Sequence, residues 1–550
     1  MGEIQDTAAD PTPATNPGPT ARAASMVWDA WGDPAGHKPL PEQIRGLLRQ
    51  VFGVSGDAVA RRDEGDVPLR PSALTDDDRG GLAAVVGAGG ISVEHGDRLR
   101  HAGGKSALDL LRRRAEGPQD APDAVVFPAD HDEVVAVLEH CAARGIAVVP
   151  FGGGTSVVGG LDPIRGRFRL VVALDLRRLD ALLALDAVSG TATLGAGVTG
   201  PRAEELLAAH GFSLGHYPQS FEYATIGGFA ATRSSGQASA GYGRFDDMVQ
   251  RLRIATPSGE LDLGRAPASA AGPDLREVFL GSEGVLGVIT EVTVRVHPLP
   301  ETVVHQAWSF PDFATGAVAL RTIVQSGAAP TVLRLSDEAE TGLNLARSAD
   351  IGGEPVHGCL AVTTFEGRAE VMAVRSALAG DLLRAAGGRD LGPEPARQWE
   401  QGRFAAPYLR DALLDVGVLC ETLETATTWS NIAELKSAVT GALTESLTGQ
   451  GTPPLVMCHI SHTYPTGASL YFTVVAKALA APIEQWTRAK RAASEAIVRA
   501  GGTITHHHAV GADHRAWLPD EIGELGVRVL AAIKREVDPV GILNPGKLIR

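Results

Sequence analysis

Apolar residues change from helical to strand-like spacing in a short region that begins near residue 122. Between Asp130 and Gly145 they recur at the spacing of one helix face, which predicts an amphipathic helix. Asp130 and Glu133 have the spacing of a capping box, and Gly145 suits the left-handed turn that ends a helix. The apolar run 146–149 then predicts a buried strand that leads into a glycine-rich segment.

The same patterns predict an α+β fold built from two main units. The first unit ends near Pro298, and its helix 201–210 begins at Pro201, a residue that suits the first turn of a helix. Its further strands are expected at 169–176, 191–195, 250–256 and 288–297. The second unit has strand-like runs at 306–308, 331–335, 359–364 and 469–475, separated by helices. Residues 481–550 are predicted to be helical, apart from a strand-like insertion at 503–510.

Composition narrows the class of protein. The net charge of −15 over 550 residues argues against a nucleic-acid partner, which would require a basic face. The four cysteines lie far apart, which fits a reducing compartment. No stretch approaches the ~20 apolar residues of a membrane span. Residues 1–25 are rich in Ala, Pro and Thr and predict a disordered tail, so we expect a cytoplasmic protein.

The glycine-rich segment is the most informative feature of the chain. Residues 150–160 read Pro-Phe-Gly-Gly-Gly-Thr-Ser-Val-Val-Gly-Gly, which lets backbone N–H groups turn toward an anion such as a diphosphate. A Rossmann fingerprint would lead into a helix, and a P-loop would end in Gly-Lys-Ser/Thr. Neither follows here, so backbone amides and the hydroxyls of Thr155 and Ser156 are expected to bind the diphosphate.

Two further clusters of small residues support a single ligand site. Residues 215–243 are dominated by Gly, Ala, Ser and Thr, and residues 281–289 read Gly-Ser-Glu-Gly-Val-Leu-Gly-Val-Ile. Small side chains let a flat and bulky ligand approach the backbone. Three such clusters separated by ordinary sequence indicate one shared site.

These clusters, together with Thr232–Ser235, resemble the FAD-binding elements of the vanillyl-alcohol-oxidase type of flavoproteins. The segments 215–220, 505–511 and 537–539 further resemble the alkyldihydroxyacetonephosphate synthase family. The resemblance implies a PCMH-type FAD-binding domain, an α+β substrate (cap) domain and a helical C-terminal segment. The expected division is a tail at 1–25, an N-terminal helical segment at 26–118, the FAD-binding domain at 119–298, the cap domain at 299–480 and the C-terminal segment at 481–550.

The resemblance implies FAD as the cofactor, bound non-covalently. Relatives that bond the flavin covalently often carry a histidine in the diphosphate loop, where this chain has Thr155. Gln219 departs from the family, which usually has an acidic residue there. The expected FAD-binding residues are Pro150, Phe151, Gly152, Gly153, Gly154, Thr155, Ser156, Gln219, Ser220, Thr225, Thr232, Arg233, Ser234, Ser235, Glu283, Gly284, Gly287, Val288 and Ile289.

The resemblance also implies an activity. Such enzymes exchange the acyl chain of acyl-dihydroxyacetone phosphate for a fatty alcohol, and the flavin N5 atom holds the dihydroxyacetone carbon during the exchange. Tyr471 matches the acid/base tyrosine of the family and shares a strand face with Thr473. A phenol of pKa ~10 needs a nearby cation to act as a base, and Arg334 is expected to supply that charge.

Three histidines and two residues of the substrate site complete the expected active site. Strand alternation predicts that His506 and His508 share a face while His507 points away, whereas the family correspondence makes His507 and His508 active-site groups. His508 is the candidate base for the alcohol, and His216 matches another functional histidine. No Asp or Glu flanks the histidine triplet, so no metal is expected. Arg410 and Thr422 match substrate-binding residues, Thr422 standing where the family has a serine.

The sequence is also compatible with two other functions. One is an FAD-linked oxidoreductase that oxidises a 2-hydroxy acid or another alcohol, although the metal-binding segments of such enzymes are replaced here by 466–471 and 506–509. The other is a flavin-binding protein in which Tyr471 and the histidines are idle. For the synthase, the expected partners are lipid substrates, with no nucleic acid, a peripheral membrane contact and a homodimer.

Overall fold

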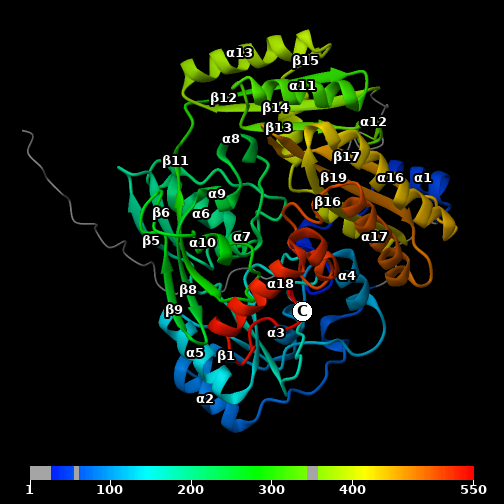
Figure 1. Cartoon of the computed structure of the whole chain (residues 1–550). Coiled ribbons are helices and arrows are strands. Elements are labelled where there is room, and N and C mark those ends of the chain that lie inside the picture. The colour runs from blue at the N-terminus through cyan, green and yellow to red at the C-terminus, as the bar shows by residue number, and fades with distance from the viewer. Residues whose placement is uncertain (1–25, 55–60, 344–356, 550) are drawn as a thin grey trace, which may run out of the picture.

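The computed structural model of the chain describes residues 26–54, 61–343 and 357–549. The tail that was predicted to be disordered, residues 1–25, lies outside the described residues. Figure 1 shows most of the N-terminal half of the chain in the lower and left parts of the molecule, and the large sheet with its helices in the upper part, where α1 also lies, near α16. The C-terminal helix α18 (Leu518–Val537) returns to the lower part.

The first described region is mainly helical. Thr75 and Ser106 are N-caps: each side chain accepts the backbone N–H of the aspartate three residues later, and that aspartate accepts the N–H of the cap. This reciprocal bonding starts two of the helices of the region. The elements are η1 (Pro34–Gly36), α1 (Glu42–Phe52), η2 (Glu64–Asp66), α2 (Asp76–Val86), η3 (Ala88–Gly90), α3 (His95–Arg100) and α4 (Ala107–Arg114).

A four-stranded sheet follows in the order β1-β2-β4-β3, with β2 and β3 parallel to β4. Its strands are β1 (Ile91–Ser92), β2 (Ala124–Val126), β3 (Ala147–Phe151) and β4 (Val171–Asp175). The predicted helix is confirmed as α5 (His131–Arg144), which ends at the left-handed Gly145. The capping box forms only in part, because the Glu133 carboxylate accepts the N–H of Ala129 instead of that of Asp130. β3 leads directly into the glycine run, as predicted.

A five-stranded antiparallel sheet in the order β5-β6-β10-β8-β9 completes the first half. Its strands are β5 (Leu182–Asp186), β6 (Thr191–Gly195), β8 (Val249–Thr256), β9 (Gly259–Leu263) and β10 (Val288–Arg295). The short strands β7 (Phe212–Ser213) and β11 (His297–Pro298) pair with each other. The helices of this region are α6 (Gly200–Ala208), α7 (Ile226–Thr232), α8 (Ser239–Tyr242), α9 (Phe245–Met248) and α10 (Arg276–Phe279).

The upper half is built on an eight-stranded sheet with the order β15-β12-β14-β13-β17-β19-β16, in which β18 pairs with β19 (Figure 1). Its strands are β12 (Thr302–Phe310), β13 (Val332–Ser336), β14 (Cys359–Gly367), β15 (Arg389–Gly392), β16 (Val418–Thr428), β17 (Leu455–Ile460), β18 (Thr463–Tyr464) and β19 (Gly467–Lys477). The accompanying helices are α11 (Phe313–Gln325), α12 (Glu338–Gly342), α13 (Ala369–Ala385), α14 (Glu394–Gly402), α15 (Ala406–Asp415), η5 (Trp429–Asn431), α16 (Ile432–Gly449) and α17 (Pro482–Arg499).

Strand alternation gives the two faces of this sheet different roles. Leu470 and Phe472 are fully buried in a core that the sheet shares with α11, α13, α16 and α17. Tyr471 and Thr473 point to the opposite face and line a cavity, as the alternation predicted. Four helices therefore cover one face of the sheet, while α1, α14 and α15 pack against parts of the other face and leave space there for a functional site.

The C-terminal region corrects one prediction. Residues 503–510 form no strand, because the backbone N–H groups of His506, His507 and His508 all point at the carboxylate of Glu424 instead of a neighbouring strand. After this loop, η6 (Arg515–Trp517) leads into α18, whose apolar side packs on the core of the five-stranded sheet. Among the described residues, no helix is long and apolar enough to cross a membrane.

Candidate active site

A cavity of about 720 Å³ lies between the lower and upper parts of the molecule. One side is formed by the three glycine-rich clusters, and the opposite side by the face of the large sheet that carries Tyr471 and Thr473. α15 and the segment Gly36–Ile44 close the remaining side. All of the predicted FAD-binding residues except Arg233 line this cavity.

The glycine run forms a cradle that leaves no space for side chains. A Cβ atom at Gly153 would lie 1.9 Å from the carbonyl oxygen of Tyr223, and one at Gly152 would lie 2.4 Å from the hydroxyl oxygen of Thr225. Gly154 has a φ of +75°, a conformation that side chains disfavour. The backbone of the run is therefore exposed to a ligand, which is the condition for binding a diphosphate through N–H groups.

One buried polar atom of the second cluster also fits a flavin. The side-chain amide nitrogen of Gln219 is buried and finds no hydrogen-bond partner within the described part of the chain. Gln219 lines the cavity, as does Ser235, whose hydroxyl interacts with Tyr464. Because buried polar groups are nearly always hydrogen-bonded, the Gln219 amide is available for a polar atom of FAD.

Glu283 connects the third cluster to the C-terminal region. Its carboxylate accepts the N–H groups of Val510 and Gly511, each at 2.7 Å, while its backbone carbonyl accepts the side chain of Asn544. Burial raises the pKa of Glu283 to about 7. The chain after the histidine triplet is thereby fixed beside the FAD-binding loops.

Two predicted residues lie away from the cavity. Arg233 donates to Asp246 and Glu277 instead of reaching the ligand space, because its left-handed backbone directs the side chain outward. His216 is completely buried between the rings of Phe229 and Phe245. Its Nε2 atom lies 3.0 Å from the hydroxyl of Ser234, so it touches the cavity wall only through that residue.

Tyr471 is the centre of the polar face of the cavity. It pairs in register with His459 on β17 and with Glu424 on β16, and its ring stacks on that of His459 at 4.9 Å. Burial raises the pKa of Tyr471 to about 12, although a hydrogen bond with Thr422 opposes this rise. The phenol is therefore protonated near neutral pH and suits the role of proton donor.

Arg334 lines the cavity, and its guanidinium is held next to His459. Arg334 donates to the carboxylate of Glu340, and its Nη2 atom lies 2.9 Å from Nδ1 of His459, whose ring stacks on Tyr471. The guanidinium of Arg410 lowers the pKa of Tyr471. A cation effect of Arg334 on Tyr471 stays a prediction.

The histidine triplet forms a tight turn opposite Tyr471. His507 and His508 line the cavity, whereas His506 turns toward Tyr464, with Nε2 2.6 Å from the phenol oxygen. This arrangement corrects the predicted alternation and agrees with the family correspondence. The rings of Tyr471 and His508 are 5.7 Å apart, and burial lowers the pKa of His508 to about 3, so this imidazole is neutral at physiological pH.

The substrate residues predicted from the family also meet here. Arg410, on α15, lines the cavity and is held by Asp411 and by the carbonyl oxygen of Lys105. Thr422, on β16, lines the same space beside Tyr471. A guanidinium fixed at the edge of a buried cavity suits a phosphate group.

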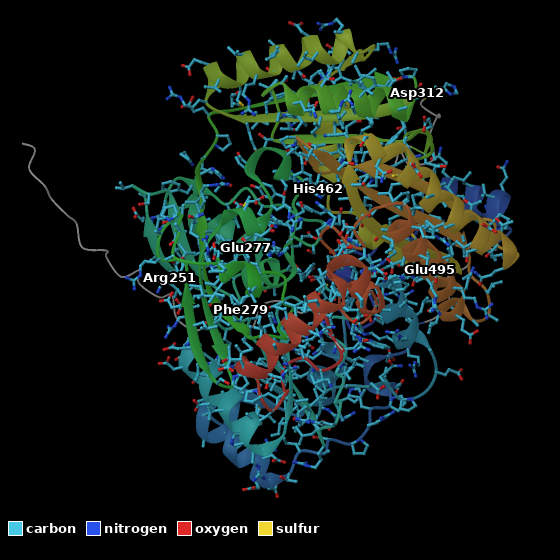
Figure 2. All side chains as sticks on the ribbon, viewed as in Figure 1. Arg251, Glu277, Phe279, Asp312, His462 and Glu495 are labelled. Atoms are coloured by element: carbon cyan, nitrogen blue, oxygen red, sulfur yellow. The ribbon has the colours of Figure 1, made fainter. Side chains whose placement is uncertain are left out.

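Several cavity residues were missed from the sequence. They are Trp31, Lys38, Arg403, Tyr408, His459 and His462. The last two stand three residues apart in the run His459-Ile-Ser-His462 at the end of β17, a spacing that could have indicated them. His462 is buried, and Figure 2 shows it nearer the middle of the view than Asp312 and Glu495.

Three neighbouring histidines, two of them buried, raise the question of a metal. Ring nitrogens of His462, His506 and His507 lie within 4.8 Å of one another, a grouping that could hold an ion. Both ring nitrogens of His506 are already within hydrogen-bond distance of other groups, Nε2 of Tyr464 and Nδ1 of His507. The carboxylate that the sequence lacked near the triplet is supplied by Glu424, which bonds mainly to backbone N–H groups.

We therefore expect dialysis against EDTA to leave the FAD content and the turnover of the protein unchanged. The hydrogen bonds of His506 occupy the lone pairs that a metal would need. Metal content by mass spectrometry and activity before and after dialysis provide the measurement. A loss of activity that Zn²⁺ alone restores would show that the three histidines bind a metal.

Comparisons with known proteins identify the family and the fold of the chain. The family model for an FAD binding domain matches residues 122–263, and the model for the C-terminal domain of FAD linked oxidases matches residues 299–548. Alkyldihydroxyacetonephosphate synthase of Dictyostelium discoideum is 34% identical over 82% of this chain and 77% of its own length. A solved structure of alkyldihydroxyacetonephosphate synthase aligns with a TM-score of 0.80 and 30% identity, over 95% of this chain and 98% of that one. p-Cresol methylhydroxylase aligns with a TM-score of 0.68 and 17% identity, over 87% of this chain and 98% of that one, and shares the fold.

The fold and the glycine-lined cavity thus define a PCMH-type flavoprotein that binds FAD. Within that class, the chain belongs to the alkyldihydroxyacetonephosphate synthase family.

Proposed function

We propose that this protein is an FAD-dependent enzyme that exchanges the acyl group of acyl-dihydroxyacetone phosphate for a fatty alcohol, a step of ether-lipid synthesis. The observation that carries the proposal is the meeting of Tyr471, His507 and His508 on one side of a cavity whose other side is the FAD cradle. FAD, when bound, supplies the atom that holds the dihydroxyacetone carbon during the exchange.

Four residues of the cavity have separate roles in the proposed reaction. The protonated Tyr471 is placed to exchange a proton with the substrate carbon or with the departing acid. The neutral His508 is placed to accept the proton of the incoming alcohol. Arg410 offers its guanidinium to the phosphate, and Thr422 offers a hydroxyl beside Tyr471.

One wall of the cavity supports lipid substrates. It is lined by apolar side chains from the N-terminal segment and from α15. These residues are Pro39, Leu40, Pro41, Ile44, Leu409 and Ala412. Such a wall accepts an alkyl chain and limits the entry of water, which would otherwise compete with the alcohol.

The absorbance spectrum of the purified protein tests this function. We expect the flavin band to bleach when palmitoyl-dihydroxyacetone phosphate is added without oxygen, and to recover with release of the ether product when hexadecanol follows. Omission of hexadecanol is the control. The oxidoreductase alternative would instead be established if the flavin spectrum does not change with this ester, but the flavin is reduced by a 2-hydroxy acid and reoxidised by an acceptor.

The homodimer, the peripheral membrane contact and the cytoplasmic location that the sequence suggested stay predictions. They follow from the lipid substrates and from the composition, and none of them is needed to form the cavity within one chain.

A further inference from the structure

Glu424 is a buried carboxylate directly behind the histidine triplet. It is 3% exposed and lies on β16 in register with Tyr471 on β19. Its two oxygens accept four hydrogen bonds from consecutive residues of the loop. The donors are the hydroxyl of Thr505 at 2.7 Å and the backbone N–H groups of His506 at 2.7 Å, His507 at 3.0 Å and His508 at 2.9 Å.

This bonding explains why the loop has its shape. A run of successive N–H groups pointing at one anion forms a nest, which closes the backbone around the bound oxygen atoms. In this protein the anion is a side chain from a rigid strand in the middle of a sheet. The position of the triplet is therefore set by the same pair of strands that carries Tyr471.

Glu424 also faces the imidazole rings. Its carboxylate oxygens lie 3.5 Å from Nδ1 of His507 and 4.0 Å from Nδ1 of His508. Burial alone would raise the pKa of Glu424, but the neighbouring histidines and the hydrogen bonds hold it well below its usual range. The group is thus a permanent negative charge beside the candidate base.

We propose that Glu424 is a positioning residue of the alkyl exchange: its carboxylate holds the His507–His508 turn opposite Tyr471 and offsets the positive charge that His508 gains. This inference rests on the proposed function. Glu424 acts through the histidines, since it does not itself line the cavity.

The proton balance of the exchange shows where this charge matters. His508 takes the proton of the alcohol, so the alcohol O–H bond breaks and an imidazolium forms. Over the whole exchange, the bond from the dihydroxyacetone carbon to the acyl oxygen breaks, its electron pair leaves with the fatty acid as a carboxylate, and a bond from that carbon to the alcohol oxygen replaces it. The imidazolium then gives its proton to that acid or to water, which restores the neutral ring.

The surroundings of His508 make Glu424 the charge that favours this step. The carboxylate raises the pKa of the His508 imidazole, although burial lowers it more. The other groups that face the ring work against protonation; they are His507, His514 on the same loop and Lys490 on α17. The phenol of Tyr471, which projects from β19, is uncharged, and its ring lies 5.7 Å from the His508 ring. Removal of the carboxylate charge therefore makes the alcohol proton harder to accept.

The variant Glu424→Gln tests the proposal because the amide keeps the size and one acceptor oxygen but loses the charge. We expect bound FAD and KM to stay near wild type, while kcat falls by about tenfold to a thousandfold. Because a lost negative charge lowers the pKa of an imidazole, the acid limb of the kcat–pH profile should move to lower pH. A variant with wild-type kcat and an unmoved acid limb would overturn the proposal.

Two further variants complete the experiment. Glu260→Gln removes a glutamate that contacts His131 at 2.8 Å on the surface, away from the cavity, and should leave kcat and the pH profile unchanged. Glu424→Asp keeps the negative charge, but its side chain is one methylene shorter and places the carboxylate farther from the loop. The acid limb of the kcat–pH profile should therefore stay near wild type while kcat falls. If Glu424→Gln does not fold, wild-type kcat in Glu424→Asp overturns the proposal.

Histidine ring titration by NMR separates this inference from the proposed function, because it needs no substrate. In Glu424→Gln the pKa of the His508 ring should lie below that of wild type. A wild-type protein that performs no alkyl exchange, with this difference in ring titration still present, would refute the proposed function and leave the electrostatic role of Glu424 intact. Identical titrations would refute the role of Glu424.

Discussion

Tyr471→Phe is expected to leave the protein yellow and to reduce kcat by on the order of 10²- to 10⁴-fold, the usual contribution of a positioned acid or base. The Tyr471 phenol is protonated near neutral pH because burial raises its pKa to about 12. Its ring is held in place by stacking on His459. Phenylalanine keeps the stacking and removes only the hydroxyl. The measurements are the flavin spectrum and the rate of ether formation.

The matched control for this variant is Tyr408→Phe. Tyr408 also lines the cavity, but it lies on α15 and contacts the N-terminal segment near Gly32 and Gly36. We expect kcat to change by less than about tenfold, because this phenol lies outside the row that joins His459, Tyr471 and Glu424. Wild-type turnover in Tyr471→Phe would remove Tyr471 from the mechanism.

Gly153→Val is expected to produce a folded protein without FAD. The added Cβ would lie 1.9 Å from the carbonyl oxygen of Tyr223 and 2.8 Å from Cα of Ala224, and both of these are backbone atoms that cannot turn aside. The glycine run must therefore shift, and a misplaced N–H cradle loses its fit to the diphosphate. We expect FAD affinity to fall by at least about tenfold, since overpacking typically costs ~1–3 kcal/mol.

The absorbance ratio at 450 and 280 nm after gel filtration measures this loss. Gly441→Val is the matched control, because Gly441 lies on α16 with open space around its Cβ position. That control should retain FAD at the wild-type level. A normal flavin spectrum in Gly153→Val would show that the run 150–160 does not hold the diphosphate.

The part of the site that sequence reasoning found is the part that local sequence controls. A tight, amide-lined loop needs glycine and small residues in consecutive positions, so the clusters at 150–160, 215–243 and 281–289 are visible in the sequence. The alternation of Leu470, Tyr471 and Phe472 likewise follows from strand geometry alone. Each of these predictions rests on neighbours in the chain.

The predictions that failed concern groups brought together from distant positions. Residues 503–510 were predicted as a strand from their composition, but a carboxylate some 80 positions earlier takes up their N–H groups. Arg233 was expected at the flavin, but two acidic residues draw it outward.

The sequence by itself therefore determined the class of ligand, through glycine runs whose backbone must approach a diphosphate, and the strand face on which Tyr471 lies. Only the tertiary structure decided which charged groups surround that face, because the partners of a buried charge come from whichever strands and loops pack against it. His459, Glu424 and the His507–His508 turn meet at Tyr471 for this reason. Their protonation follows from burial and from each other's charge, and neither of these is encoded in local sequence.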